Sequence, residues 1–109
     1  GRMPLWEARN GTMSADGRSF ADDLEKPMLD YFKMFYGDTA MFGAKAQSQA
    51  GLDFFGSGNS FFATDAPYDL TGGESNIRET IEVIESLNCE DSDRQAIYED
   101  NTRKLLLGA

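Results

Sequence analysis

Residues 60–65, SFFATD, decide the fold expected for this sequence, because they contain a short run that is apolar on both faces. Such a run is typical of a parallel strand that is covered by helices on both sides. Residues 34–39, MFYGDT, are a second strand candidate, in which aromatic side chains are bounded by Gly37 and Asp38. Residues 44–55 are rich in alanine and glutamine, which favours a helix. The order strand, helix, strand predicts two parallel strands joined by a helical crossover.

A longer helix is predicted over residues 77–87. Asn76 and Glu79 form an N-x-x-E capping pattern at its start. Its apolar residues fall on one helical face. They are Ile77, Ile81, Ile84 and Leu87.

The two ends of the sequence are predicted as a loop and two further helices. Residues 1–18 have no sustained period and are expected to form a loop. A short helix is expected to start at Pro27, which suits a first helical turn. The last helix is expected to begin at a capping box of Ser92 and Gln95 and to end at Gly108.

Composition excludes several classes of protein. The net charge is −9, whereas proteins that bind nucleic acids present clustered lysine and arginine. No apolar run approaches the roughly 20 residues that span a bilayer, and no signal peptide is recognisable, so a cytoplasmic protein is expected. Cys89 is the single cysteine and there is no histidine, so neither a disulfide nor a cysteine or histidine zinc set can form within the chain.

Three segments, taken in order, resemble the closing segments of the amidohydrolase-related family that includes aminocarboxymuconate-semialdehyde decarboxylase. They are FYGDTAMFG (35–43), GLDFFGSGNSFFATDAPYD (51–69) and GGESNIRETIEVIESLNCEDSDRQAIYEDNTRKLLLG (72–108). The strand-ending pair Thr64-Asp65 is followed by Pro67, as in the family. Asn101 and the paired leucines after it resemble the family's final signature. Thr102 departs from it, because many relatives carry alanine there.

The resemblance implies a fold larger than this sequence. It makes the chain the C-terminal part of a (β/α)₈ TIM barrel. Residues 1–18 would be an active-site loop, and residues 19–109 the last two β/α units with the C-terminal helix. A whole barrel needs about 250 residues, so the 109 residues are incomplete as a barrel. The missing neighbours of the two strands would come from the rest of a barrel or from other copies of the chain.

Asp65 is the catalytic residue that the resemblance implies. In the family the matching aspartate binds a catalytic divalent metal, usually zinc, and transfers a proton for the metal-bound water. Barrel active sites lie at the C-terminal ends of the strands, where Asp65 falls if residues 60–64 are the last strand. The alternative is that Asp65 only caps a turn before Pro67.

Arg9 is the second residue that the resemblance singles out. In decarboxylases of the family, an arginine at the matching place in the loop reaches a neighbouring subunit and holds a carboxylate of the substrate. Guanidinium suits this role, because it can bind a carboxylate through two parallel hydrogen bonds. A small carboxylate-containing substrate and a homo-oligomer are therefore expected. The alternative is an exposed loop arginine.

Two functional classes remain open from the sequence. The first is a part of a metal-dependent hydrolase or non-oxidative decarboxylase that is inactive by itself. The second is a self-contained, acidic, non-catalytic interaction or oligomerisation module. Asp38 also ends a strand, but ordering of its own loop is the simpler role for it. Glu79, Glu82 and Glu85 are expected to form a solvated helix face rather than a metal cluster.

Overall fold

The computed structural model describes residues 24–108, which form a mixed α/β fold with two parallel strands. The predicted loop over residues 1–18 lies outside the described residues. In chain order the elements are α1 (Met28–Phe32), β1 (Gly37–Asp38), α2 (Lys45–Phe55), a 3₁₀ turn η2 (Ser57–Asn59), β2 (Ser60–Phe61), α3 (Glu74–Ser86), α4 (Asp91–Gln95), a π-helical turn η3 (Ala96–Asp100) and α5 (Asn101–Leu107).

The strands β1 and β2 are the centre of the fold and pair in parallel. Gly37 lies opposite Ser60, and Asp38 lies opposite Phe61. Parallel strands cannot be joined by a tight turn, and α2 provides the crossover between them. The predicted parallel pairing and the helix between the strands are confirmed.

Both strands are shorter than the sequence predicts. The amides of Met34 and Phe35 donate to carbonyls of α1 at 3.1 and 3.2 Å, so this part of residues 34–39 is a turn rather than a strand. Met34, Phe35 and Tyr36 are also exposed, although their aromatic and apolar character had predicted a short buried strand over residues 34–39. Apolar character alone does not bury a strand that lacks further neighbours.

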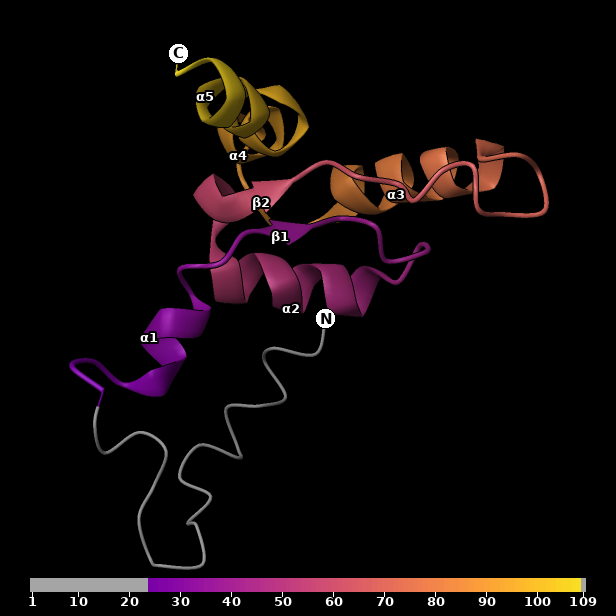
Figure 1. Cartoon of the computed structure of the whole chain (residues 1–109). Helices are drawn as coiled ribbons and strands as arrows, with labels where there is room; N and C mark the ends of the chain where they lie inside the picture. The colour runs from indigo at the N-terminus through magenta and orange to yellow at the C-terminus, as the bar shows by residue number, and fades with distance from the viewer. Residues whose placement is uncertain (1–23, 109) are drawn as a thin grey trace, which may run out of the picture.

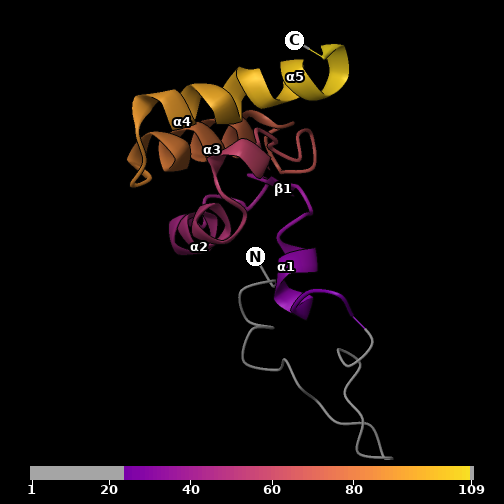
Figure 2. The same ribbon diagram turned by 90° about the vertical axis from the view of Figure 1, so that its left-hand side faces the viewer.

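Helices lie on both sides of the strands. Figure 1 shows α2 on one side and the continuous run of α4, η3 and α5 on the other. In Figure 2, turned by 90°, the same run crosses the top of the molecule and α2 lies below it. α2 also contacts α3. In the part of the chain that the structure describes, no helix is long and apolar enough to cross a membrane.

The core is small and draws on three helical segments. Its buried members are Leu52 from α2, Ile84 and Leu87 from α3 and its end, and Ile97 from η3. Half-buried side chains, including Phe62 and Tyr98, pack against them. Each fully buried aliphatic side chain contributes about 1.5–3 kcal/mol to the free energy of folding relative to an exposed one. The four buried side chains of residues 24–108 therefore help to hold the helices against one another.

The apolar face of α3 is only partly covered. Ile84 and Leu87 are buried, as that face predicts, but Ile77 and Ile81 are exposed. Figure 1 shows the reason, since the start of α3 extends beyond the strands and the other helices. The predicted capping by Asn76 is wrong: the N-cap is Gly73, at φ 105°.

The C-terminal helical run is fixed to β2 by hydrogen bonds from both sides. Phe62 N donates to Ile97 O at 3.0 Å, and Asn101 Nδ2 donates to the carbonyls of Ser57 and Ser60 at 2.6 and 2.8 Å. The widened π turn η3 lies where the run meets the strand. Asn101 therefore connects α5 to the turn before β2.

The ends of this run match the prediction at one end only. Gly108 ends α5 in the left-handed conformation, at φ 67°, as predicted. The predicted capping box of Ser92 and Gln95 is wrong, because Glu90 is the N-cap and its amide donates to Asp93 Oδ2 at 3.2 Å.

Candidate functional site

Asp65 lies beyond the carboxyl end of β2, on an exposed loop. The strand was expected to continue to residue 64, but β2 ends at Phe61, so Asp65 is four residues past the ladder. Its φ of 59° is left-handed, which a non-glycine residue seldom adopts. Within residues 24–108, its carboxylate has no hydrogen bond or ion pair.

The segment before Asp65 is held by Thr39, the residue after β1. Thr39 Oγ1 donates to Ala63 O at 2.8 Å and accepts from Ala63 N at 3.0 Å. The backbone of Thr39 adds a third bond, from its amide to Phe61 O at 3.1 Å. Side-chain hydrogen bonds thus continue the pairing of the two strands where their backbones separate.

The segment after Asp65 is held by the start of α3. Asp65 O accepts from Tyr68 N at 3.0 Å and from Asn76 Nδ2 at 3.4 Å. Asn76 is 5% exposed, so its amide is fixed inside the fold. The carbonyl of Asp65, and not its carboxylate, accepts these bonds.

Asp69, four residues further on, carries most of the charge-assisted bonding of this loop. Its Oδ1 accepts from Thr71 N at 2.7 Å and Gly73 N at 2.8 Å, and its Oδ2 accepts from Asn76 N at 2.9 Å. These backbone donors hold the pKa of the Asp69 carboxyl well below its ordinary value. The sequence analysis did not identify Asp69; the signal for it was its place four residues before Gly73.

Asp38 orders its own loop, as expected. It is exposed, and its Oδ1 accepts from Ala40 N at 2.9 Å. This is a local Asx-type bond that tightens the turn after β1. Asp38 is the last residue of β1 and Asp65 lies beyond the end of β2, at the same edge of the parallel pair, but no hydrogen bond joins them.

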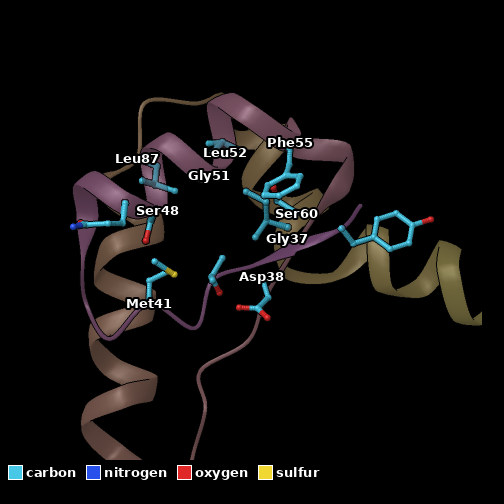
Figure 3. A pocket seen from close by; sticks show the side chains of 13 residues that line it. Gly37, Asp38, Met41, Ser48, Gly51, Leu52, Phe55, Ser60 and Leu87 are labelled. Carbon is cyan, nitrogen blue, oxygen red and sulfur yellow. The ribbon is translucent and has the colours of Figure 1, made fainter. Parts of the chain in front are cut away.

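A separate hollow of about 260 Å³ lies between α2 and the strand pair, as Figure 3 shows. Gly37, Leu52, Phe55, Ser60 and Leu87 are among its lining residues. Its wall is close-packed at one point, because a Cβ on Gly37 would lie 2.8 Å from Phe55 Cδ2. Asp65 does not line the hollow, so the structure does not bring the two together.

The residues described here do not by themselves make a metal centre. Among residues 24–108 there is no group of three or more histidine, cysteine, aspartate or glutamate side chains that could hold a metal ion. Burial raises the pKa of the half-buried Cys89 thiol, which disfavours the thiolate that binds zinc. Asp65 therefore offers at most one ligand.

Two other sequence-based expectations have different outcomes. Arg9, the proposed substrate-binding residue, lies outside the described residues. Glu82 and Glu85 are exposed on α3 and Glu79 is half-buried, in agreement with a largely solvated face. Glu85 also accepts a hydrogen bond from the Tyr98 hydroxyl at 2.8 Å.

In comparisons with known proteins, no family model matches the chain, and no curated protein matches it either.

Proposed function

We propose that this chain is the C-terminal part of a metal-dependent enzyme of the amidohydrolase-related type, in which Asp65 is a catalytic carboxylate. The observation that carries the proposal is the place of Asp65: an exposed, unpaired carboxylate among the described residues, on the loop at the carboxyl end of a parallel β–α–β unit. In open and closed parallel sheets alike, ligands bind at this end of the strands.

The chemistry assigned to Asp65 is proton transfer and cation binding. A carboxylate in reach of an attacking water can accept its proton as a general base. Its oxygens are also suitable ligands for a divalent cation such as zinc. The described residues do not fit a complete zinc site, so the proposal places the remaining ligands in parts of a larger protein outside this sequence.

The proposed substrate is a small carboxylic acid, and the reaction is its hydrolysis or its non-oxidative decarboxylation. Arg9 is proposed to hold the substrate carboxylate through paired hydrogen bonds. If it acts across a subunit boundary, the enzyme is a homo-oligomer with shared active sites.

The exposed leucines of α5 favour a second candidate function. Leu105, Leu106 and Leu107 are all exposed, and an acidic chain with an apolar helix end suits a non-catalytic interaction module. The encoded sequence upstream of Gly1 separates the two functions. Histidine-bearing strands there, including an H-x-H motif, support the enzyme, and an initiator methionine close to Gly1 supports the module.

The decisive experiment is Asp65→Asn in the full-length enzyme. Asparagine keeps the size of the side chain but removes the charge and the proton acceptor, so turnover is expected to fall by at least about a hundredfold while the protein still folds. Asp100→Asn, at an exposed position on η3, is the matched control and should keep full turnover. Activity of Asp65→Asn within about tenfold of wild type, with unchanged metal content, would contradict the proposal.

A further inference from the structure

We propose that Thr39 is a positioning residue for Asp65, because its hydroxyl fixes the backbone from which the Asp65 side chain projects. The proposal rests on the proposed function of Asp65 for its catalytic consequence. The hydrogen bonds themselves can be tested without any activity.

The hydroxyl of Thr39 makes hydrogen bonds to the second strand segment at the point where the backbone of β1 turns away from it. The regular register ends at Asp38 opposite Phe61. After Thr39 the chain turns back on itself, since Met41 N donates to Thr39 O at 2.8 Å. The amide and carbonyl of Ala63 would then have no partner on β1.

A hydroxyl can satisfy both groups of Ala63, because it donates one hydrogen bond and accepts others. Thr39 Oγ1 does both, at 2.8 Å to Ala63 O and 3.0 Å from Ala63 N. The two residues are 24 positions apart in sequence, so these bonds fix the chain across the sheet rather than within one loop. Valine has the same shape as threonine and can make neither bond.

Asp65 is two residues beyond Ala63, and its other side is also fixed. The buried amide of Asn76 donates to Asp65 O, as does the backbone of Tyr68. The φ of Asp65, 59°, is left-handed, a conformation that a non-glycine residue seldom adopts and that the surrounding hydrogen bonds help to hold. With the backbone held before and after, the position from which the Asp65 side chain projects is fixed, and the carboxylate itself has no partner among the described residues.

The first test is NMR on the isotope-labelled 109-residue chain. Thr39→Val should speed hydrogen exchange of the Ala63 amide about tenfold and shift the Asp65 amide resonance. Thr39→Ser, which keeps the hydroxyl, should leave both close to wild type. Thr102→Val, on the exposed side of α5, is the matched control and should change neither. In the wild-type chain a nuclear Overhauser contact between the Thr39 side chain and the Ala63 amide checks the geometry even if Thr39→Val does not fold.

The second test is kinetic and uses the full-length enzyme. Thr39→Val should lower kcat by about tenfold to a hundredfold with little change in KM, and Thr39→Ser should recover most of the loss, because a misplaced carboxylate still leaves the substrate bound. Unchanged Ala63 exchange, or an unchanged kcat in Thr39→Val while Asp65→Asn is inactive, overturns the proposal. Full activity in Asp65→Asn overturns the proposed function instead, and Ala63 exchange still decides whether Thr39 fixes this segment.

Discussion

Thr80 is a buried residue whose hydroxyl has no hydrogen-bond partner in the described part of the chain. The residue is 2% exposed, and among residues 24–108 its Oγ1 has no hydrogen-bond partner. A buried hydroxyl without a partner loses its hydration and gains nothing in return. Thr80 therefore lowers the stability of α3 below what an apolar side chain of the same shape would give.

We expect Thr80→Val to raise the free energy of unfolding by about 1 kcal/mol, because valine fills the same space without a hydroxyl. The stability of β-branched residues in a helix is similar, so helix propensity cancels in the comparison. Urea unfolding followed by circular dichroism measures the change. Thr102→Val, at an exposed position on α5, should have almost no effect. A loss of stability in Thr80→Val would show that the hydroxyl has a stabilising partner.

The ionised carboxylate of Asp69 holds the loop after Asp65 against the start of α3 by accepting hydrogen bonds from backbone amides there. Its pKa is lowered in the folded chain because the amides of Gly73 and Asn76 donate to the carboxylate. In the unfolded chain an aspartate titrates near pH 3.9. Below that pH the unfolded state takes up a proton that the folded state does not, so this contribution is complete above about pH 4 and is lost as the pH falls further.

Asp69→Asn should therefore lower the free energy of unfolding at pH 6. It should also make that free energy change less between pH 6 and pH 3. Asparagine lacks the charge, and its amide nitrogen cannot accept from a backbone N–H. Urea titrations at pH 6 and pH 3 should show a smaller loss on acidification in Asp69→Asn than in wild type. The control is Asp100→Asn, which should leave the difference between the two pH values unchanged. If Asp69→Asn lost as much unfolding free energy between pH 6 and pH 3 as wild type does, the stabilising role of the charged Asp69 would be contradicted.

At the scale of elements, Arg94 joins the end of α3 to α4. Its Nε donates to Ile84 O at 3.3 Å, its Nη2 donates to Leu87 O at 2.9 Å, and its Nη1 pairs with Asp91 at 2.6 Å. The last carbonyls of a helix have no partner within it. The planar guanidinium donates to two carbonyls at this helix end at once, in a place where the core residues Ile84 and Leu87 are buried. Each carbonyl also accepts one backbone amide, that of Leu87 at 3.2 Å and that of Cys89 at 3.1 Å.

Arg94→Ala is expected to lower the free energy of unfolding by about 1–3 kcal/mol, because the carbonyls of Ile84 and Leu87 each lose a charged donor next to the core and keep one backbone donor. Arg94→Lys should recover only part of this, since a single ammonium cannot reach both carbonyls and Asp91 together. Thermal and urea unfolding give the values. Arg78→Ala is the control, because Arg78 makes an exposed pair with Glu74 at 3.7 Å and should cost less than about 0.5 kcal/mol. Equal effects at the two arginines would refute the capping role.

The elements themselves could be predicted from sequence better than their ends. The alanine-rich crossover helix and the parallel order of the strands followed from local composition. The start of α3 could not be predicted in this way. The amides of Gly73 and Asn76 donate to Asp69, which lies further from the helix than the residues that a capping pattern includes. The strand over residues 34–39 was overestimated, since strand length depends on neighbours that local sequence does not contain.

The candidate site shows the same division. The position of Asp65 on the loop after the second strand followed from the order of segments, although the strand ends earlier than predicted. The roles of Thr39 and Asn76 could not be predicted, because their partners are 24 and 11 residues away in sequence. Only the folded chain shows which side chains support that loop.

At the scale of the whole molecule, many large apolar side chains of residues 24–108 are exposed, while only four form the buried core. Met34, Phe35 and Tyr36 are exposed beside β1, and the leucines of α5 are exposed too, with Leu106 at 73%. Leu105 and Tyr36 line the same surface hollow. Neighbouring exposed apolar side chains favour association. The net charge of −9 opposes it, since copies of the chain repel one another.

We therefore expect the 109-residue chain to self-associate, more strongly as salt screens the repulsion, and to retain no stoichiometric zinc. Sedimentation at low and high ionic strength should show species larger than a monomer that grow with salt. Leu106→Glu should reduce them, whereas Asn88→Glu, which adds the same charge at an exposed position away from α5, should have a smaller effect. Elemental analysis after dialysis tests the second half, because the chain has no histidine and its described carboxylates do not cluster. A monodisperse monomer that retains one zinc ion per chain would contradict both halves, since a closed metal site of that kind needs ligands that neither the sequence composition nor the described residues provide.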